Sequence, residues 1–271
     1  MNRAIWWIVL ILVWVAIGAA VYYWWQQKQE PQPLPPPRIE APPPAPVEPE
    51  GQTRHPIEAI QPEAKPSAKE EAPLPSLQDS DNAAQEALAS LIGRDPLAAF
   101  FESTGLIRRI VATVDNLPRT KAMPQRWPIK PTPGRFITSG GGDDVTLSAE
   151  NFRRYEPFVR RLEAVDTDKL VALYKRFYPL FQQAYRELGY PKKYFNDRLV
   201  EMIDDMLAAP EVKGPIKLAK PWVMYEFADS ELEARSAGQK ILIRMGADNA
   251  ARVKAKLREI RQRVASGVPK Q

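Results

Sequence analysis

The stretch DTDKLVALYKRFYPLFQQAYRELG, residues 166–189, decides the fold class. Its large apolar side chains recur every three or four residues, the spacing that places them along one face of an α-helix. Asp166 is a suitable N-cap, and Gly189 provides a C-terminal stop. Pro179 lies inside the pattern, so we expect a bend there. The apolar face consists of Leu170, Leu173, Tyr174, Phe177, Phe181, Ala184, Tyr185 and Leu188.

Helical patterns continue on both sides of this stretch. The segments with the expected spacing are 82–92, 106–117, 152–162, 195–207 and 253–264. Glycine or proline ends several of them, at Gly93, Pro118 and Pro210. The pattern predicts one mainly α domain over residues 79–265, large enough for its own hydrophobic core.

Two regions depart from the helical period. Residues 135–147, RFITSGGGDDVTL, predict a small β-hairpin, with GGGDD as its turn. Residues 216–227 also read as extended chain. In the helix that follows the hairpin, we expect Ser148 to be the N-cap and Pro157 to introduce a kink.

The run AIWWIVLILVWVAIGAAVYYWW, residues 4–25, carries no charged side chain. As a helix it measures ~33 Å, enough to cross the ~30 Å hydrocarbon core of a bilayer. Tryptophan and tyrosine stand at both ends, where a spanning helix meets the lipid headgroups. We expect a short tail over 1–3 and a single transmembrane helix over 4–25. The alternative is a signal peptide cleaved near residues 18–20.

Residues 26–78 form a proline-rich segment that contains PQPLPPP and APPPAPVEPE. Proline removes a backbone donor and fixes φ, so neither helix nor sheet runs through such a segment. It also has few large apolar side chains to offset the loss of chain entropy. We therefore expect a disordered linker over 26–78 and a short disordered tail over 266–271.

Composition excludes several kinds of chemistry. Cysteine is absent, histidine occurs once, at position 55, and the net charge is +5 at pH 7. Disulfides and thiol catalysis are excluded, and a Ser-His-Asp triad or a histidine-rich metal site is not expected. No motif for a metal or a cofactor is present, so we expect neither.

Three stretches carry a family resemblance: GLIRRIVATVDNLPR at 105–119, ELGYPKKYFNDRLVEMIDDMLAAPEVKGPIKL at 187–218, and YEFADSELEARSAGQKILIRMGADNAARVKAKLREI at 225–260. They resemble the bacterial domain-of-unknown-function family numbered 3014, found mostly in proteobacteria, over roughly residues 80–262. The family has no assigned activity, so the resemblance assigns no catalytic residue. It implies a membrane-anchored bacterial protein.

The strongest candidate for a binding site is the loop 118–135, which is rich in proline and has no acidic residue. Loops longer than about 12–15 residues tend to be functional or disordered. Cations beside a tryptophan can hold an anionic or sugar ligand through charge and ring contact. The alternative is a meander packed on the core. The residues that we predict for the site are Arg119, Lys121, Arg126, Trp127, Lys130 and Arg135.

Three further groups have both a functional and a structural interpretation. Four carboxylates share one side of the helix 195–207: Asp197, Glu201, Asp204 and Asp205. Such carboxylates can serve glycoside hydrolysis or bind a cation, but they lie opposite the apolar face, so we expect them to be solvated. The basic side chains of the last helix, 253–264, are a second choice for a binding surface, and a solvated face is the expectation there too. The aromatic residues over 174–195 are expected in the core rather than in a sugar-stacking cleft.

These patterns favour a single-pass protein of the bacterial inner membrane with its basic domain in the periplasm. The order of segments, a very short N-terminus before one span and a long linker, resembles that of many envelope proteins. The expected role is a non-catalytic interaction module that binds a protein or an anionic envelope ligand, with nucleic acid not expected as a partner. The alternatives are a carboxylate-dependent envelope glycan hydrolase and a cytoplasm-facing scaffold.

Overall fold

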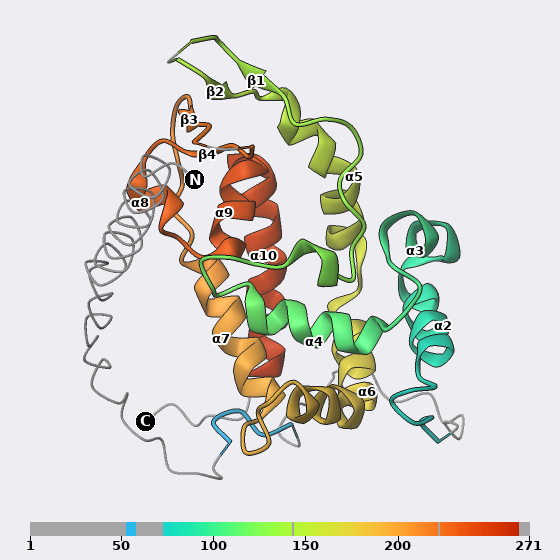
Figure 1. Cartoon of the computed structure of the whole chain (residues 1–271). Helices are drawn as coiled ribbons and strands as arrows, with labels where there is room; N and C mark the ends of the chain where they lie inside the picture. The colour runs from blue at the N-terminus through green and yellow to red at the C-terminus, as the bar shows by residue number, and fades with distance from the viewer. Residues whose placement is uncertain (1–52, 58–72, 143, 222, 266–271) are drawn as a thin grey trace, which may run out of the picture. The chain divides into compact units, whose positions relative to one another are not determined.

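Figure 1 shows the computed structural model of the chain, which describes residues 53–57, 73–142, 144–221 and 223–265. All of them belong to one unit of the chain, residues 49–271. The predicted anchor over 4–25, most of the predicted linker and the tail over 266–271 lie outside the described residues. Within the described ranges, no helix combines the length and the apolar character needed to cross a membrane.

The described chain is mainly helical, as the sequence predicts. Its α-helices are α2 (Asp81–Ile92), α3 (Arg94–Phe100), α4 (Leu106–Asn116), α5 (Glu150–Ala164), α6 (Thr167–Glu187), α7 (Phe195–Leu207), α8 (Ser230–Glu233), α9 (Ala237–Arg244) and α10 (Ala247–Val264). A 3-10 turn, η2 (Pro124–Arg126), lies in the loop that follows α4.

The named strands of the described residues form short antiparallel pairs at one end of the domain (Figure 1). Strands β1 (Thr138–Ser139) and β2 (Thr146–Leu147) form the hairpin predicted from residues 135–147. A Cβ at Gly140 (φ +84°) would lie 2.2 Å from the Asp144 carbonyl oxygen, so this tight turn requires glycine.

The extended region 216–227 forms a second pair, β3 (Leu218–Ala219) with β4 (Glu226–Phe227). Leu218 stands opposite Phe227 in this pair, and both side chains are buried. They belong to a small apolar cluster that also includes Ile243 of α9. The cluster fastens both hairpins to the helical part of the domain.

The main core lies where α10 packs against α5, α6, α7 and α9, and where α4 packs against α6 and α7 (Figure 1). The predicted apolar face of α6 contributes the buried side chains of Phe177, Phe181 and Tyr185. Phe181 stacks on Phe195 of α7, with ring centroids 5.5 Å apart. The prediction that the aromatic residues serve the core is confirmed for these rings.

Helix ends follow the predicted chemistry with one small difference. The Asp166 carboxylate accepts hydrogen bonds from the main-chain N–H groups of Asp168 and Lys169, which confirms it as the N-cap of α6. Ser148 is one position earlier than the N-cap of α5, although its Oγ accepts from the Glu150 N–H at 3.3 Å. Pro157 lies within α5 as a helical residue.

The folded part also includes residues from the segment predicted as linker. Leu77 is only 5% exposed and belongs to the main core. Leu74 and Ile57 pack against that core. Residues 53–57 are thus placed on the domain by specific contacts, which are described below.

Candidate functional site

The predicted loop 118–135 is held in place by arginines from two helices. A loop without regular structure has main-chain carbonyl groups that need donors. Arg154 of α5 donates to three consecutive carbonyl oxygens, those of residues 132–134, at 2.9–3.2 Å. Arg109 of α4 donates to two more, within residues 125–127, at 3.0 and 3.2 Å. The loop is therefore an ordered part of the domain surface.

Two of the predicted site residues are used to attach the loop to the helices. Arg119 Nη2 donates to Asp115 Oδ2 at 2.6 Å and to the Tyr190 hydroxyl at 2.9 Å. The charge of the buried Asp115 is the main reason why the pKa of Arg119 is raised. Lys130 Nζ donates to the carbonyl oxygen of Ala98 in α3 at 2.7 Å. The charge of Arg119 is thus matched within the fold, whereas Lys130 is held through a neutral carbonyl group.

The other predicted residues lie in different surroundings. Lys121 and Arg135 are exposed, and neither forms a hydrogen bond or ion pair with another residue in the described ranges. Trp127 is half-buried, and its indole Nε1 is buried without a hydrogen-bond partner among the described residues. The structure therefore does not direct the six predicted side chains at one point. Their role in binding stays a prediction.

Arg126 lines a cleft with two arginines that the sequence interpretation left out. The cleft has a volume of about 290 Å³ and lies between α4, η2 and the C-terminal part of α6. Arg108 and Arg109 line it from α4, and Arg108 is paired with Glu187 of α6. Arg126 is exposed, and its side chain has no hydrogen bond or ion pair within the described part of the chain. The apolar lining residues are Val111, Ala112, Ala184 and Leu188. We call this site the arginine cleft.

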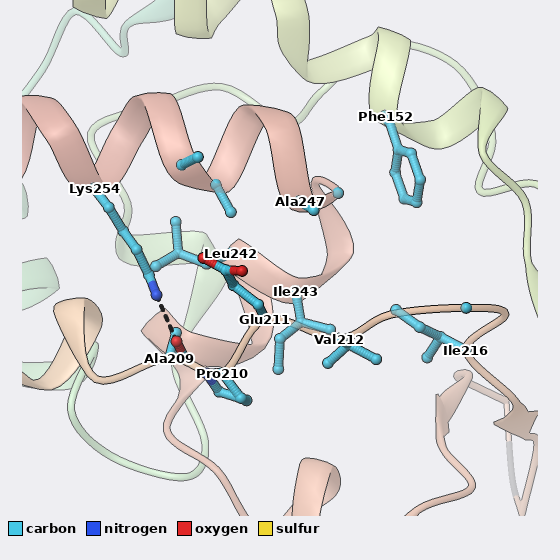
Figure 2. Close-up of a pocket in the computed structure, with 14 residues that line it drawn as sticks. Phe152, Ala209, Pro210, Glu211, Val212, Ile216, Leu242, Ile243, Ala247 and Lys254 are labelled. Carbon is cyan, nitrogen blue, oxygen red and sulfur yellow. Dashed lines mark hydrogen bonds between the residues drawn. The ribbon is translucent and has the colours of Figure 1, made fainter.

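A second hollow, the apolar cavity, lies between α9, α10 and the segment 209–216 (Figure 2). Its volume is about 220 Å³, and Leu242 and Ile243 contribute to its apolar wall. Lys254 of α10 lines it, and its ammonium group donates to the carbonyl oxygen of Ala209, just beyond the end of α7 (Figure 2). Burial lowers the pKa of Lys254. A cation at the C-terminal end of a helix is stabilising, so this lysine has a structural role.

The basic side chains of α10 serve the fold in the same way. Lys256 Nζ donates to the carbonyl oxygen of Val165, where α5 ends, and to Thr167 Oγ1, both at 3.1 Å. Three arginines of α10 pair with acids on other helices: Arg252 with Glu163, Arg261 with Asp204, and Arg263 with Asp168. These contacts correct the expectation of a solvated basic face.

The acidic residues of α7 are also engaged rather than simply solvated. Asp204 pairs with Arg261 of α10, and Asp205 accepts a hydrogen bond from Ser236 Oγ at 2.6 Å. Asp197 and Glu201 contact residues 53–55. Each carboxylate is matched by its own neighbour, because α7 is covered on this side by α10, by α9 and by the N-terminal segment.

Sequence reasoning missed the part that Arg108, Arg109 and Arg154 play. The sequence contained a signal for this role, because the loop is rich in proline, which has no main-chain N–H to donate to the carbonyl groups. Arginines that lie off the apolar face of a flanking helix are natural donors for such a loop. The arginines of α4 and α5, the helices that flank the loop, were therefore the residues to consider as donors.

The fold and these sites define a mainly helical domain that carries an arginine-lined cleft and a small apolar cavity. The chain belongs to the family described as Protein of unknown function (DUF3014), whose model matches residues 106–261. This match confirms the resemblance and runs from α4 into α10. No curated protein and no solved structure matches the chain.

Proposed function

We propose that the helical domain is a non-catalytic binding module and that the arginine cleft is its contact surface for an anionic partner. The observation that carries the proposal is the exposed side chain of Arg126, which has no hydrogen bond or ion pair among the described residues and lies beside Arg108 and Arg109. Guanidinium groups bind carboxylates and phosphates through paired, charge-assisted hydrogen bonds. The apolar lining would favour a partner that has carbon surface next to its charge.

A matched pair of variants tests this assignment. Arg108→Ala/Arg126→Ala removes two charges from the cleft, whereas Lys121→Ala/Arg135→Ala removes two exposed charges from the same loop outside it. Arg119 and Lys130 are left unchanged because they hold the loop to the helices. The purified full chain would be titrated with an oligoglutamate peptide and sedimented with isolated cell-wall sacculi.

The cleft variant should bind about threefold to tenfold more weakly, because exposed charged contacts contribute modestly. The control variant should bind like the parent, and added salt should weaken binding for both. An equal loss in the two variants would show that binding follows net charge and not the cleft.

We further propose that residues 4–25 anchor the protein in the inner membrane as a single span, with the domain in the periplasm. The uncharged run with aromatic residues at both ends supports the span. N-terminal sequencing of the mature protein tests whether the segment is retained. A reporter enzyme active only in the periplasm, fused after Gln271, tests the orientation. An inactive, stably produced fusion would favour the cytoplasm-facing scaffold.

The alternative of a glycan hydrolase requires two carboxylates that face one cleft. The acids of α7 are instead used in separate contacts with α9, α10 and the N-terminal segment. This arrangement supports the binding module.

A further inference from the structure

Residues 53–57, Thr-Arg-His-Pro-Ile, lie on α7 although they precede it by more than 130 positions. We call these residues the strap. The Asp197 carboxylate accepts hydrogen bonds from the main-chain N–H of His55 at 2.7 Å and from that of Arg54 at 3.1 Å. Thr53 Oγ1 lies 3.3 Å from the same carboxylate. One acidic side chain therefore accepts from three donors of a short segment without strand structure.

The strap is also held at its carbonyl groups and side chains. Asn196 Nδ2 donates to the carbonyl oxygen of His55 at 2.8 Å. Arg54 Nη2 donates to Glu201 Oε1 at 2.8 Å. Ile57 packs against the main core. Main-chain donors, a main-chain acceptor, a charge and an apolar side chain of the strap are thus matched, as they are for a bound peptide. The imidazole Nδ1 of His55 is buried without a hydrogen-bond partner among the described residues.

Part of the receiving surface is held by contacts that do not involve the strap. Asn196 is fully buried, and its Oδ1 accepts from the Tyr174 hydroxyl at 3.0 Å. Its Nδ2 also donates to the carbonyl oxygen of Val264 in α10 at 3.0 Å. Two other helices therefore hold the asparagine as well as the strap does.

We propose that Asn196, Asp197 and Glu201 form a docking site for the chain's own strap, and that docking is a releasable second attachment of the domain to its N-terminal segment. Release is physically accessible because much of the interaction is near solvent. The side chains of Arg54 and Glu201 are 48% and 45% exposed, and exposed ion pairs contribute little to stability.

Docking would change how far the domain can lie from the membrane, given the anchor proposed above. With the strap docked, the tether comprises residues 26–52. With the strap released, it comprises residues 26–72 and is 20 residues longer. The docking site itself does not depend on the anchor or on the arginine cleft.

The chain contains one histidine, so a histidine-labelled full chain in detergent gives one imidazole resonance in the NMR spectrum. Burial lowers the pKa of His55 below 6.5. Arg54 of the strap and Arg261 of α10 also lower it, whereas Asp197 and Asp204 of α7 raise it. The titration of this one signal therefore reports whether the strap is docked.

In the variant Asp197→Ala, the direction in which the pKa of His55 changes distinguishes a released strap from a docked one. If the strap is released, the pKa of His55 rises towards 6.5. If the strap remains docked, loss of the attractive carboxylate lowers the pKa further. We expect the rise, together with amide hydrogen exchange at Arg54 and His55 that is at least about tenfold faster than in the parent. The matched control Glu231→Ala, an exposed acid on α8, should change neither readout.

A second variant controls for the case in which Asp197→Ala unfolds the domain. Arg54→Ala leaves α7 intact and should also speed exchange in the strap, while the amides of Met202 and Ile203 stay protected. A His55 pKa that falls in Asp197→Ala, or strap exchange unchanged in both variants, would overturn the proposal. A His55 pKa in the parent that rises on dilution would show that a second copy supplies the strap, and this too would overturn attachment within one chain.

Discussion

Arg198 of α7 donates a hydrogen bond to the main-chain carbonyl oxygen of Asp115 in α4 at 2.6 Å, and its Nε lies 3.3 Å from the Asp115 carboxylate. Asp115 is only 4% exposed, and Arg119 of the loop contacts the same carboxylate. One buried acid thus joins α4, α7 and the start of the loop 118–135. Removing the Asp115 carboxylate leaves the guanidinium groups of Arg119 and Arg198 without their shared partner.

We expect Asp115→Ala to lower the free energy of unfolding by about 1.5–3 kcal/mol, because the buried carboxylate loses its charge-assisted contacts with Arg119 and Arg198. Urea denaturation followed by circular dichroism measures this change. The control is Asp144→Ala, which removes an exposed partner of Lys217 and should cost less than about 1 kcal/mol. Similar losses in the two variants would contradict the structural role of Asp115.

The contact of Lys256 with the end of α5 can be tested within α10 itself. Lys256→Met removes the buried donor to Val165 and Thr167, and we expect a loss of about 2 kcal/mol in unfolding free energy. Arg258→Met makes a comparable change at an exposed position two residues away and should be close to neutral. Thermal unfolding of both variants, compared with the parent, provides the measurement. A larger shift for Arg258→Met would argue against this use of Lys256.

Gly246 joins α9 to α10 in a backbone conformation with φ of +85°. A Cβ there would lie 2.6 Å from the Phe152 ring of α5. We expect Gly246→Ala to destabilise the domain by about 2–4 kcal/mol, from the left-handed strain and the overlap with the ring. Gly141→Ala is the control, since a Cβ at that position meets nothing within 4 Å. Equal midpoints of urea unfolding for the two variants would refute this expectation.

Docking of the strap should weaken as the pH falls. The lowered pKa of His55 means that the docked chain binds fewer protons than the released chain near pH 6. Docking is therefore strongest above pH 6.5 and weakens as the pH falls towards the lowered pKa. Burial raises the pKa of Glu201, but hydrogen bonds from Arg54 and Arg198 outweigh it and the net shift is downward, so a second loss follows below pH 4.5.

The measurement is the fraction of docked Arg54 amide signal between pH 7.5 and 5.5, a range that brackets the ordinary histidine pKa of about 6.5. In His55→Gln the side chain stays neutral, so the change across this range should disappear. Docking that becomes stronger as the pH falls would show that the predicted direction of the pH dependence is wrong.

Helices were predictable where an apolar face and a stop occur together. The helix α4 ends at Asn116, shortly before Pro118, and α7 ends at Leu207, before Pro210. Local chemistry also identified the Asp166 cap, because its partners are only two and three residues away. These features depend on short stretches of chain, which a single sequence contains in full.

The partners of the charged residues were not predictable in this way. Helical spacing shows which side of α10 Lys256 occupies, but its partner Val165 is 91 positions away. The contact between the strap and the domain was not predictable for a similar reason. Its proline-rich surroundings indicate a linker, and what places it on the domain is Asp197, far along the chain. Composition describes a segment's own preferences and carries no information about a surface elsewhere.

The position of α10 in the chain has a consequence for biosynthesis. This helix supplies the lysines that complete the C-terminal ends of α5 and α7, and it packs against α5, α6, α7 and α9. While a ribosome is still making the earlier helices, those ends have no partner and the core lacks its central member. The domain can therefore reach its final fold only after residue 264 has been synthesised.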